Sequence, residues 1–137
     1  MAKLFKFEVV APKRIFYSDE VEMITFNTAN GEMGVMAGHV PMLIALKPCV
    51  LTMSKGAEKK YAFISEGFIE VTKEKVTAIV DHAQWAEEID VERAIRDKKW
   101  AEEQLINAKE DLQMKAQLQA SIERAASRIK TARTLRQ

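Results

Sequence analysis

The sequence has little cysteine, almost no net charge and no long apolar run, and each scarcity excludes a class of protein. Cys49 is the only cysteine, which excludes an internal disulfide and a cysteine-based metal cluster and predicts a small buried side chain. The formal net charge of +1 argues against a nucleic-acid-binding protein that depends on general basicity. No run approaches the roughly 20 apolar residues of a membrane-spanning helix, and the N-terminus lacks a signal-peptide core. We therefore expect a cytosolic chain with no direct insertion into a membrane.

Glycine and proline are also scarce, and they are confined to one part of the chain. All five glycines and all three prolines precede residue 70, so residues 70–137 contain no strong breaker of secondary structure. This asymmetry predicts two domains with a boundary near residues 81–88. We assign residues 1–84 to the first domain and residues 85–137 to the second.

The first domain is predicted to be a sheet protein, because short apolar segments alternate with turn signals. Phe5, Phe7 and Val9 alternate with charged side chains in the manner of a half-buried strand. Asn30-Gly31 and Gly56 supply residues that tolerate positive φ, and a polar corner follows residue 71. An antiparallel sandwich or barrel is the natural solution. The expected strands occupy residues 4–10, 21–27, 42–46, 50–53, 61–64, 68–71 and 76–80.

The second domain is rich in strong helix formers and is predicted to be an antiparallel two-helix hairpin. Asp90 is expected to cap the first helix, and residues 107–111 are expected to form the turn. The fold class is therefore α+β and mainly β. Because alanine buries little apolar area, the hairpin should pack weakly and open, although a stably packed hairpin remains the alternative. The apolar stripe of the second helix consists of Met114, Leu118, Ile122, Ala125, Ile129 and Ala132.

Charge is segregated along the predicted helices. Residues 85–112 hold nine acidic and five basic side chains, whereas residues 113–137 hold one acidic and six basic side chains. A solvated face is the usual fate of such charges. Arg124 and Arg128, however, lie at positions i and i+4 and project from the same side of the helix. Two guanidinium groups in that arrangement are suited to phosphate or to an acidic partner.

Residues typical of catalysis are hard to find. The two histidines, His39 and His82, lie in no metal-ligating or catalytic pattern, and the sequence has no phosphate-binding loop of the Walker type and no nucleophile elbow. An enzyme is therefore disfavoured. Residues 31–41, GEMGVMAGHVP, contain three glycines, a density too high for a regular strand. They predict an exposed loop in which His39 is a structural or contact residue.

The same segment resembles a known family. Epsilon subunits of F-type ATP synthases carry a G-E-L-G-(I/V)-x-(P/A)-G-H-x-P loop, which residues 31–41 match with Met33 in place of leucine. Residues 65–71, SEGFIEV, resemble the family's S-G-G-F-x-E-V strand with Glu66 in place of the first glycine. Residues 89–94, IDVERA, match its I/L-D-x-x-R-A motif. The pieces agree with the family in order and spacing over nearly the whole chain.

The resemblance implies an N-terminal antiparallel β-sandwich of about ten strands and a C-terminal two-helix hairpin. It also implies a non-catalytic rotor subunit, peripheral at the cytoplasmic face of the cell membrane. In the family the sandwich binds the gamma subunit and rests on the ring of c subunits, so that ion flow is coupled to ATP synthesis. Glu32 and His39 are expected to be polar contacts with that ring, or else only to shape the loop. The full expected ring contact is Gly31, Glu32, Gly34, Gly38, His39 and Pro41.

The resemblance assigns regulation to the hairpin. In the family the hairpin either folds on the sandwich or extends between the alpha and beta subunits and blocks hydrolysis. ATP, where it binds as a regulatory ligand, stabilises the folded state. The matching positions give Asp90, Arg93, Arg124 and Arg128 as nucleotide-binding residues. Contact with an acidic segment of the beta subunit is assigned to Arg124, Arg128, Lys130 and Arg133.

Two positions depart from the family members that bind ATP. Gln84 and Trp100 stand where those members have an acidic residue and another arginine, so the affinity for ATP could be reduced or absent. Trp100 would stack on a base or pack against the sandwich, and packing is favoured. Two rival functions remain, a small β-barrel hydrolase or isomerase that uses His39 with Glu32, and a free-standing ATP sensor. Neither explains the whole ordered set of motifs.

Overall fold

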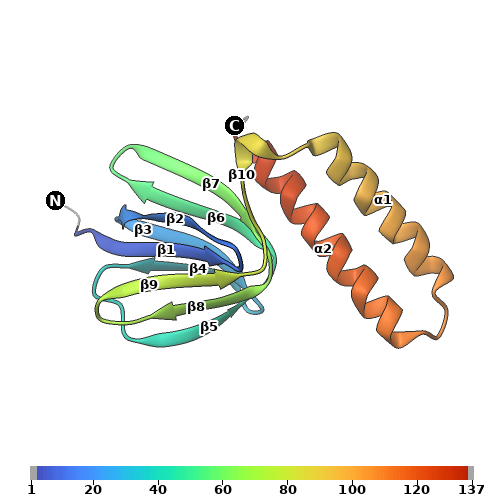
Figure 1. The fold of residues 1–137 in the computed structure, drawn as a ribbon, viewed down its shortest axis with the longest axis horizontal. Coiled ribbons are helices and arrows are strands. Elements are labelled where there is room, and N and C mark those ends of the chain that lie inside the picture. Colours follow the sequence, from blue (N-terminus) through green and yellow to red (C-terminus); the bar gives the residue numbers. More distant parts are fainter. Residues whose placement is uncertain (1–2, 136–137) are drawn as a thin grey trace.

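The computed structural model describes residues 3–135, which form a β-sandwich followed by a helical hairpin (Figure 1). The predicted α+β class is confirmed. A short 3-10 helix (Ala86–Glu88) joins the sandwich to α1 (Val91–Asn107) and α2 (Leu112–Thr134). The ten strands are β1 (Phe5–Ala11), β2 (Arg14–Val21), β3 (Met23–Thr28), β4 (Gly31–Met36), β5 (Met42–Leu46), β6 (Cys49–Lys55), β7 (Glu58–Ile64), β8 (Gly67–Val71), β9 (Lys75–Val80) and β10 (Ala83–Trp85).

The strands form two five-stranded sheets that pack face to face. The first sheet has the order β2-β1-β9-β8-β5, and the second has the order β10-β7-β6-β3-β4. Every pairing is antiparallel except that of β1 with β9, which is parallel. Alternate side chains of both sheets fill the space between them. Phe7 and Ile69 of the first sheet and Phe26 and Leu51 of the second are at most 1% exposed.

Three strands differ from the sequence prediction. β2 and β10 lie almost entirely outside the predicted segments, and both are edge strands of their sheets. β4 is the third, because residues 31–36 pair with β3 although a loop was expected over 31–41. That prediction was wrong because glycine weakens a strand without preventing pairing at a sheet edge. Only residues 37–41 form the connection to β5.

The predicted turns and caps are confirmed. Gly31 and Gly56 adopt φ of 111° and 62° in the turns that precede β4 and β7. Asp90 caps α1 by accepting a hydrogen bond of 3.1 Å from the backbone N–H of Arg93. Asp111 caps α2 in the same way with a bond of 3.0 Å, so the turn between the helices lies where the sequence places it.

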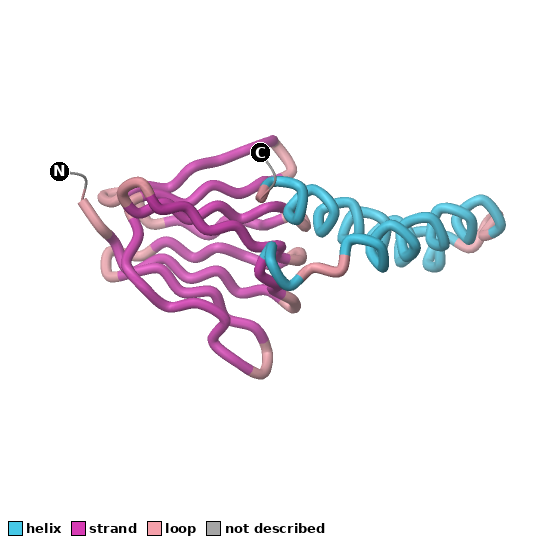
Figure 2. Tube along the Cα trace, turned by 90° about the horizontal axis from the view of Figure 1, so that it is seen from above, coloured by secondary structure: helices cyan, strands magenta, loops and turns pink. Residues whose placement is uncertain are grey.

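The hairpin lies against the outer face of the second sheet mainly through α2, with Val91 at the start of α1 packed beside Phe63. Three consecutive residues of β7, Ala62, Phe63 and Ile64, are fully buried, which departs from the alternation of a half-exposed strand. The reason is that α2 packs against β6 and β7 and covers their outer face. Phe63 is thereby enclosed by Ile89 and Ala132. Figure 2 shows that the rest of the hairpin projects beyond the sandwich, with α1 packed on α2.

Most of the predicted buried residues lie where the sequence places them. Leu118, Ala125, Ile129 and Ala132 of the α2 stripe are at most 8% exposed. Met114 is 48% exposed because it lies in the first turn of α2, at the free end of the hairpin. Cys49 is buried in the sandwich core, and burial raises the pKa of its thiol to about 11. Its predicted role as a small core residue is confirmed.

Two strand glycines differ in what surrounds them, which gives a stability prediction. A Cβ at Gly67 would overlap the backbone carbonyl oxygen of Ile79, whereas a Cβ at Gly34 would meet only the terminal methyl of Met23 at 2.9 Å. Backbone cannot move aside as a flexible side chain can. We expect Gly67→Ala to lower the free energy of unfolding by at least about 2 kcal/mol and Gly34→Ala by less than about 1 kcal/mol. Urea unfolding measures both, and equal losses would contradict this account.

Candidate functional site

One face of α2 carries the polar contacts that hold the hairpin on the sandwich. Ser127 donates a hydrogen bond of 2.9 Å to the backbone carbonyl of Pro48. The guanidinium of Arg128 lies 4.4 Å from the ring centre of Phe63, and its Nε–H donates a bond of 3.3 Å to Oε1 of Gln84. Ser127 and Arg128 are consecutive residues, so their contacts reach different parts of the sandwich, the carbonyl of Pro48 in one case and β7 and β10 in the other. The face combines a cation over an aromatic ring with hydrogen bonds to the sandwich.

Arg124, one helical turn before Arg128, is paired with a sandwich carboxylate. Its Nε and Nη2 donate to the two carboxylate oxygens of Glu66 at 2.8 and 3.2 Å. Both side chains are about one-third exposed. Burial is the largest single influence on Glu66 and would raise its pKa, but the hydrogen bond and charge of Arg124, together with a backbone hydrogen bond and the nearby His82, hold that pKa below its ordinary value. Hydrogen bonding to Glu66 raises the pKa of Arg124, so the two groups form a charged, bidentate pair.

Three of the four predicted nucleotide-binding residues lie together. Asp90, Arg93 and Arg128 line one pocket of about 270 Å³ between the two helices and β10. Arg124 does not line that pocket, because it faces Glu66 instead. The pocket volume lies just below the range of about 300 to 1,000 Å³ that is usual for small-molecule sites.

The charges of this pocket balance one another. Besides the two arginines it contains Asp90 and Asp97, and Nε of Arg93 lies 3.9 Å from Oδ2 of Asp97. Burial, with a smaller contribution from the charge of Arg124, lowers the pKa of Arg128. Gln84, which also lines the pocket, holds Arg128 and contributes no charge. The pocket can donate to a phosphate through its arginines, but Asp97 opposes the same anion.

Trp100 takes no part in this pocket or in the contact with the sandwich. Its side chain is 59% exposed on α1. The packing of Trp100 against the sandwich that the sequence favoured is therefore wrong. The reason is that α2 and only the start of α1 pack on the second sheet, which leaves the side of α1 that carries Trp100 in solvent.

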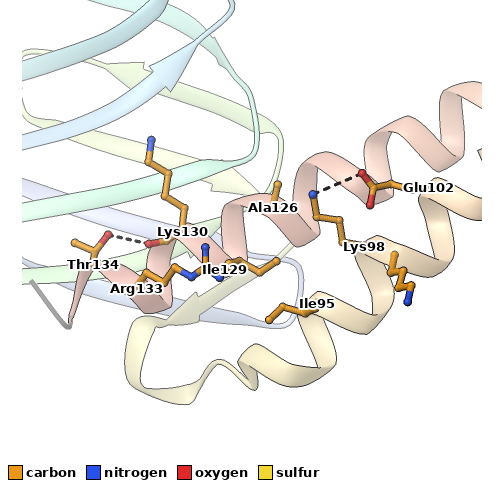
Figure 3. A pocket seen from close by; sticks show the side chains of 9 residues that line it. Ile95, Lys98, Glu102, Ala126, Ile129, Lys130, Arg133 and Thr134 are labelled. Atoms are coloured by element: carbon orange, nitrogen blue, oxygen red, sulfur yellow. Dashed lines mark hydrogen bonds and ion pairs between the residues drawn. The ribbon is translucent and has the colours of Figure 1, made fainter.

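A larger groove runs along another side of the hairpin (Figure 3). Its volume is about 750 Å³, and Ile95, Ala126 and Ile129 provide its apolar part. Lys130 and Arg133 border it, and Figure 3 shows the Lys130 side chain extending away from α1. Sequence reasoning missed this groove. Ile95, an apolar residue of α1 that is 44% exposed in the structure, was the signal for it. The remaining lining residues are Lys98, Lys99, Glu102 and Thr134.

The four residues predicted to contact a beta subunit divide between two faces of α2. Arg124 and Arg128 face the sandwich, whereas Lys130 and Arg133 border the groove between the helices. Adjacent α-helical residues differ by about 100° around the axis, so these two pairs are separated by the geometry of the helix. In the docked hairpin the four side chains do not form one basic surface.

The predicted ring-contact residues occupy both ends of β4. Gly31 and Glu32 begin the strand, Gly34 is inside it, and Gly38, His39 and Pro41 follow it. At a rise of about 3.3 Å per residue, β4 keeps the two end groups well apart. His39 is half-buried, and its Nδ1 lies 3.3 Å from the backbone carbonyl of Val40. The rival enzyme that pairs His39 with Glu32 therefore lacks the juxtaposition it needs.

The outer face of the first sheet carries an exposed apolar row that the sequence reading did not single out. The strand register aligns Ala45 with Phe68, Phe68 with Ile79, Ile79 with Val10 and Val10 with Ile15. The row crosses all five strands. Phe68, Ile79 and Ile15 are 51%, 48% and 60% exposed. The signal in the sequence was an apolar residue at positions where a half-buried strand should turn a polar side chain to solvent.

Two classes of site are not found in the part of the chain that is described. Residues 3–135 contain no group of three metal-ligating side chains. Neither of the two long helices is apolar over a length that would cross a bilayer.

Comparison with known proteins matches the chain along nearly its whole length. The beta-sandwich domain of the ATP synthase delta/epsilon chain matches residues 4–86, and the long alpha-helix domain of the same chain matches residues 87–133. The ATP synthase epsilon chain of Caldanaerobacter subterraneus is 38% identical over 96% of both chains. That of Alkaliphilus oremlandii is 42% identical over 77% of this chain and 78% of the relative.

A solved structure agrees with the sequence relatives. A chain in the mitochondrial ATP synthase of Euglena gracilis, a structure of its OSCP/F1/c-ring assembly, is 26% identical with a TM-score of 0.79. The similarity covers 90% of this chain and 78% of that one. The expected resemblance is confirmed in both the sandwich and the hairpin. The chain therefore belongs to the family of ATP synthase delta/epsilon chains.

Proposed function

We propose that this chain is a non-catalytic rotor subunit in the central stalk of an F-type ATP synthase, peripheral at the cytoplasmic face of the membrane. Its sandwich binds the gamma subunit and the c-ring, so that ion flow is coupled to ATP synthesis, and its hairpin inhibits ATP hydrolysis. Family membership supports this function. The observation that carries it is the exposed apolar row across the first sheet.

The apolar row has the character of a protein-binding surface. Single exposed apolar residues are ordinary, but contiguous ones on adjacent strands mark an interaction surface. Phe68 is the largest side chain of the row and lies between Ala45 and Ile79. A shallow pocket of about 640 Å³ is formed in part by these three side chains. The gamma subunit is the partner that the family supplies for this face.

The two ends of the molecule are suited to different partners. The connection from β4 to β5, which contains Gly38, His39 and Pro41, lies at the end of the sandwich away from the hairpin (Figure 1). The hairpin projects in the other direction. A subunit placed between a membrane ring and a catalytic head needs such an arrangement. We assign the β4–β5 connection to the c-ring and the hairpin to the alpha and beta subunits.

Replacing Phe68 tests the gamma-binding face. Phe68→Gln removes a half-exposed ring whose complete burial would contribute about 1.5 to 3 kcal/mol, so we expect binding to an isolated gamma subunit to weaken roughly tenfold or more. Calorimetry or surface plasmon resonance measures the dissociation constant. Ile106→Gln is the matched control, because Ile106 is 82% exposed at the end of α1. Equal losses in the two variants, or none in Phe68→Gln, would remove the row from the interface.

The hairpin is assigned to regulation because it can leave the sandwich without disturbing the sandwich core. Its apolar contact with the second sheet consists of Phe63, Ile89 and Ala132, with Val91 partly buried beside them. The core of the sandwich forms a separate and much larger cluster. Such a division favours local opening over global unfolding.

Truncation tests this division of labour. Removing residues 87–137 leaves all ten strands in place, since β10 ends at Trp85 and the ring of Trp85 packs 4.5 Å from that of Phe16. We expect the truncated chain to bind gamma and to support ATP synthesis, while ATP hydrolysis by the assembled enzyme rises. Enzyme assembled with the intact chain is the reference. A truncated chain that folds but no longer binds gamma would refute the proposal.

A regulatory nucleotide site is the last part of this proposed function. Asp90, Arg93 and Arg128 converge on one pocket, which supports a regulatory ATP site. Asp97 and the neutral Gln84 in the same pocket oppose tight binding. We infer a weak site in which the arginines meet the phosphates and Arg124 contributes only after leaving Glu66.

A comparison of two capping aspartates distinguishes an effect on nucleotide binding from an effect on helix stability. Asp90 and Asp111 cap their helices with hydrogen bonds of nearly equal length, but only Asp90 lines the pocket. Asp90→Ala and Asp111→Ala should each cost the hairpin about 1 kcal/mol. Only Asp90→Ala should weaken ATP binding, by roughly fivefold. Isothermal calorimetry decides, and equal effects of the two variants would show that Asp90 acts only as a cap.

A further inference from the structure

Glu66 is held rigidly in the short connection between β7 and β8. The preceding residue, Ser65, is fully buried, and its backbone N–H donates to the carbonyl of His82 at 2.9 Å. The Ser65 hydroxyl in turn accepts a bond of 2.9 Å from the backbone N–H of His82. On the other side, Gly67 lies directly against the backbone of Ile79. The backbone on both sides of Glu66 is thus fixed before any helix docks.

Arg124 meets Glu66 where α2 leaves the sandwich. The residues of α2 that contact the sandwich or support that face, Arg124, Ser127, Arg128, Thr131 and Ala132, follow one another at helical spacing. Arg124 is the first of them along α2, and the N-terminal part of the helix projects beyond the sandwich (Figure 1). A bond at this position resists lifting of the helix from its projecting end.

The pair is stronger than an ordinary surface ion pair. Two parallel N–H···O bonds of 2.8 and 3.2 Å join a planar guanidinium to a carboxylate whose backbone is already fixed, so less conformational entropy is lost on pairing. The partial burial of both side chains limits screening by solvent. The apolar contact it supplements is small, because alanine provides much of the α2 side.

We propose that the Glu66–Arg124 pair is a latch, which holds α2 docked on the sandwich without any nucleotide. Glu66 supplies from within the chain the anion that a bound phosphate would otherwise present to Arg124. A guanidinium that holds both carboxylate oxygens cannot hold a second anion in the same way. Any phosphate or partner carboxylate that recruits Arg124 must therefore displace Glu66. Regulation by the released hairpin rests on the proposed function, whereas the latch itself is a property of the isolated chain.

The latch is tested by thiol labelling in the absence of nucleotide. Ala132 is 7% exposed against Phe63 and Ile89, so a thiol introduced by Ala132→Cys in a Cys49→Ser background reacts only when α2 lifts. We expect Glu66→Gln to raise the labelling rate roughly three- to tenfold. About 0.5 M NaCl should raise the rate while Glu66 is present and have little effect in Glu66→Gln.

Three further variants keep the test decisive. Arg124→Gln should raise the rate as much as Glu66→Gln, and the double variant should add nothing, because each removes the same pair. Because Arg124→Gln changes only α2, it still tests the pair if Glu66→Gln perturbs folding of the sandwich. Glu8→Gln is the control, since it breaks the 2.8 Å pair with Lys75 within the first sheet. Unchanged labelling in Arg124→Gln, additive single effects, or an equal rise in Glu8→Gln would overturn the latch. Since no ATP synthase is present, these outcomes do not depend on the proposed function.

Discussion

The burial of Phe63 on the outer face of β7 determines how the sandwich and the hairpin are joined. The Phe63 ring lies on the outward side of the sheet, and α2 together with Ile89 shields it from solvent. Phe68 lies on the outer face of the other sheet, where no part of the described chain shields it from solvent. One sheet therefore has an internal partner and the other is open to an external one. This asymmetry fits the proposed function, in which the open sheet binds a partner and the covered sheet holds a hairpin that is able to leave it.

The contact between α2 and the sandwich is mostly polar at its margins and sparsely apolar at its centre. Arg124, Ser127 and Arg128 bind groups of the sandwich that are directional, and directional bonds require one orientation of the helix. The apolar part, in contrast, is supplied largely by small side chains. A contact of this kind specifies a single docked position without making it very stable. A regulatory element needs this combination, because it must be both well defined and reversible.

Local chemistry accounts for the features that the sequence predicted. Asp90 caps α1 through its own neighbour, and Gly31 and Gly56 permit turns at their own φ angles, so no distant residue has to be known. The burial of Leu118 and Ala132 follows from a stripe that any covering surface would bury. The two-domain division was predicted from the distribution of glycine and proline along the chain, which can also be read without knowledge of distant contacts.

The features that were missed depend on distant parts of the chain. The pairing of residues 31–36 with β3 was hidden by glycine content, and the exposure of Trp100 depends on which helix covers the sheet. The sequence marked Glu66 as a departure from the family pattern and Arg124 as an anion-binding candidate. Nothing in either local pattern indicated that the two side chains meet, because their contact is set by the angle at which α2 docks.

The parallel pairing of β1 with β9 joins two strands that are synthesised far apart in time. Lys6 lies opposite Lys75, so β1 has no neighbour on that side until nearly the whole sandwich has been made. Contacts of such high sequence separation slow folding. At about 5 to 20 residues per second, β1 and its partner β2 must wait several seconds as a lone hairpin. The helices are translated after the strands of the second sheet, on which α2 then packs.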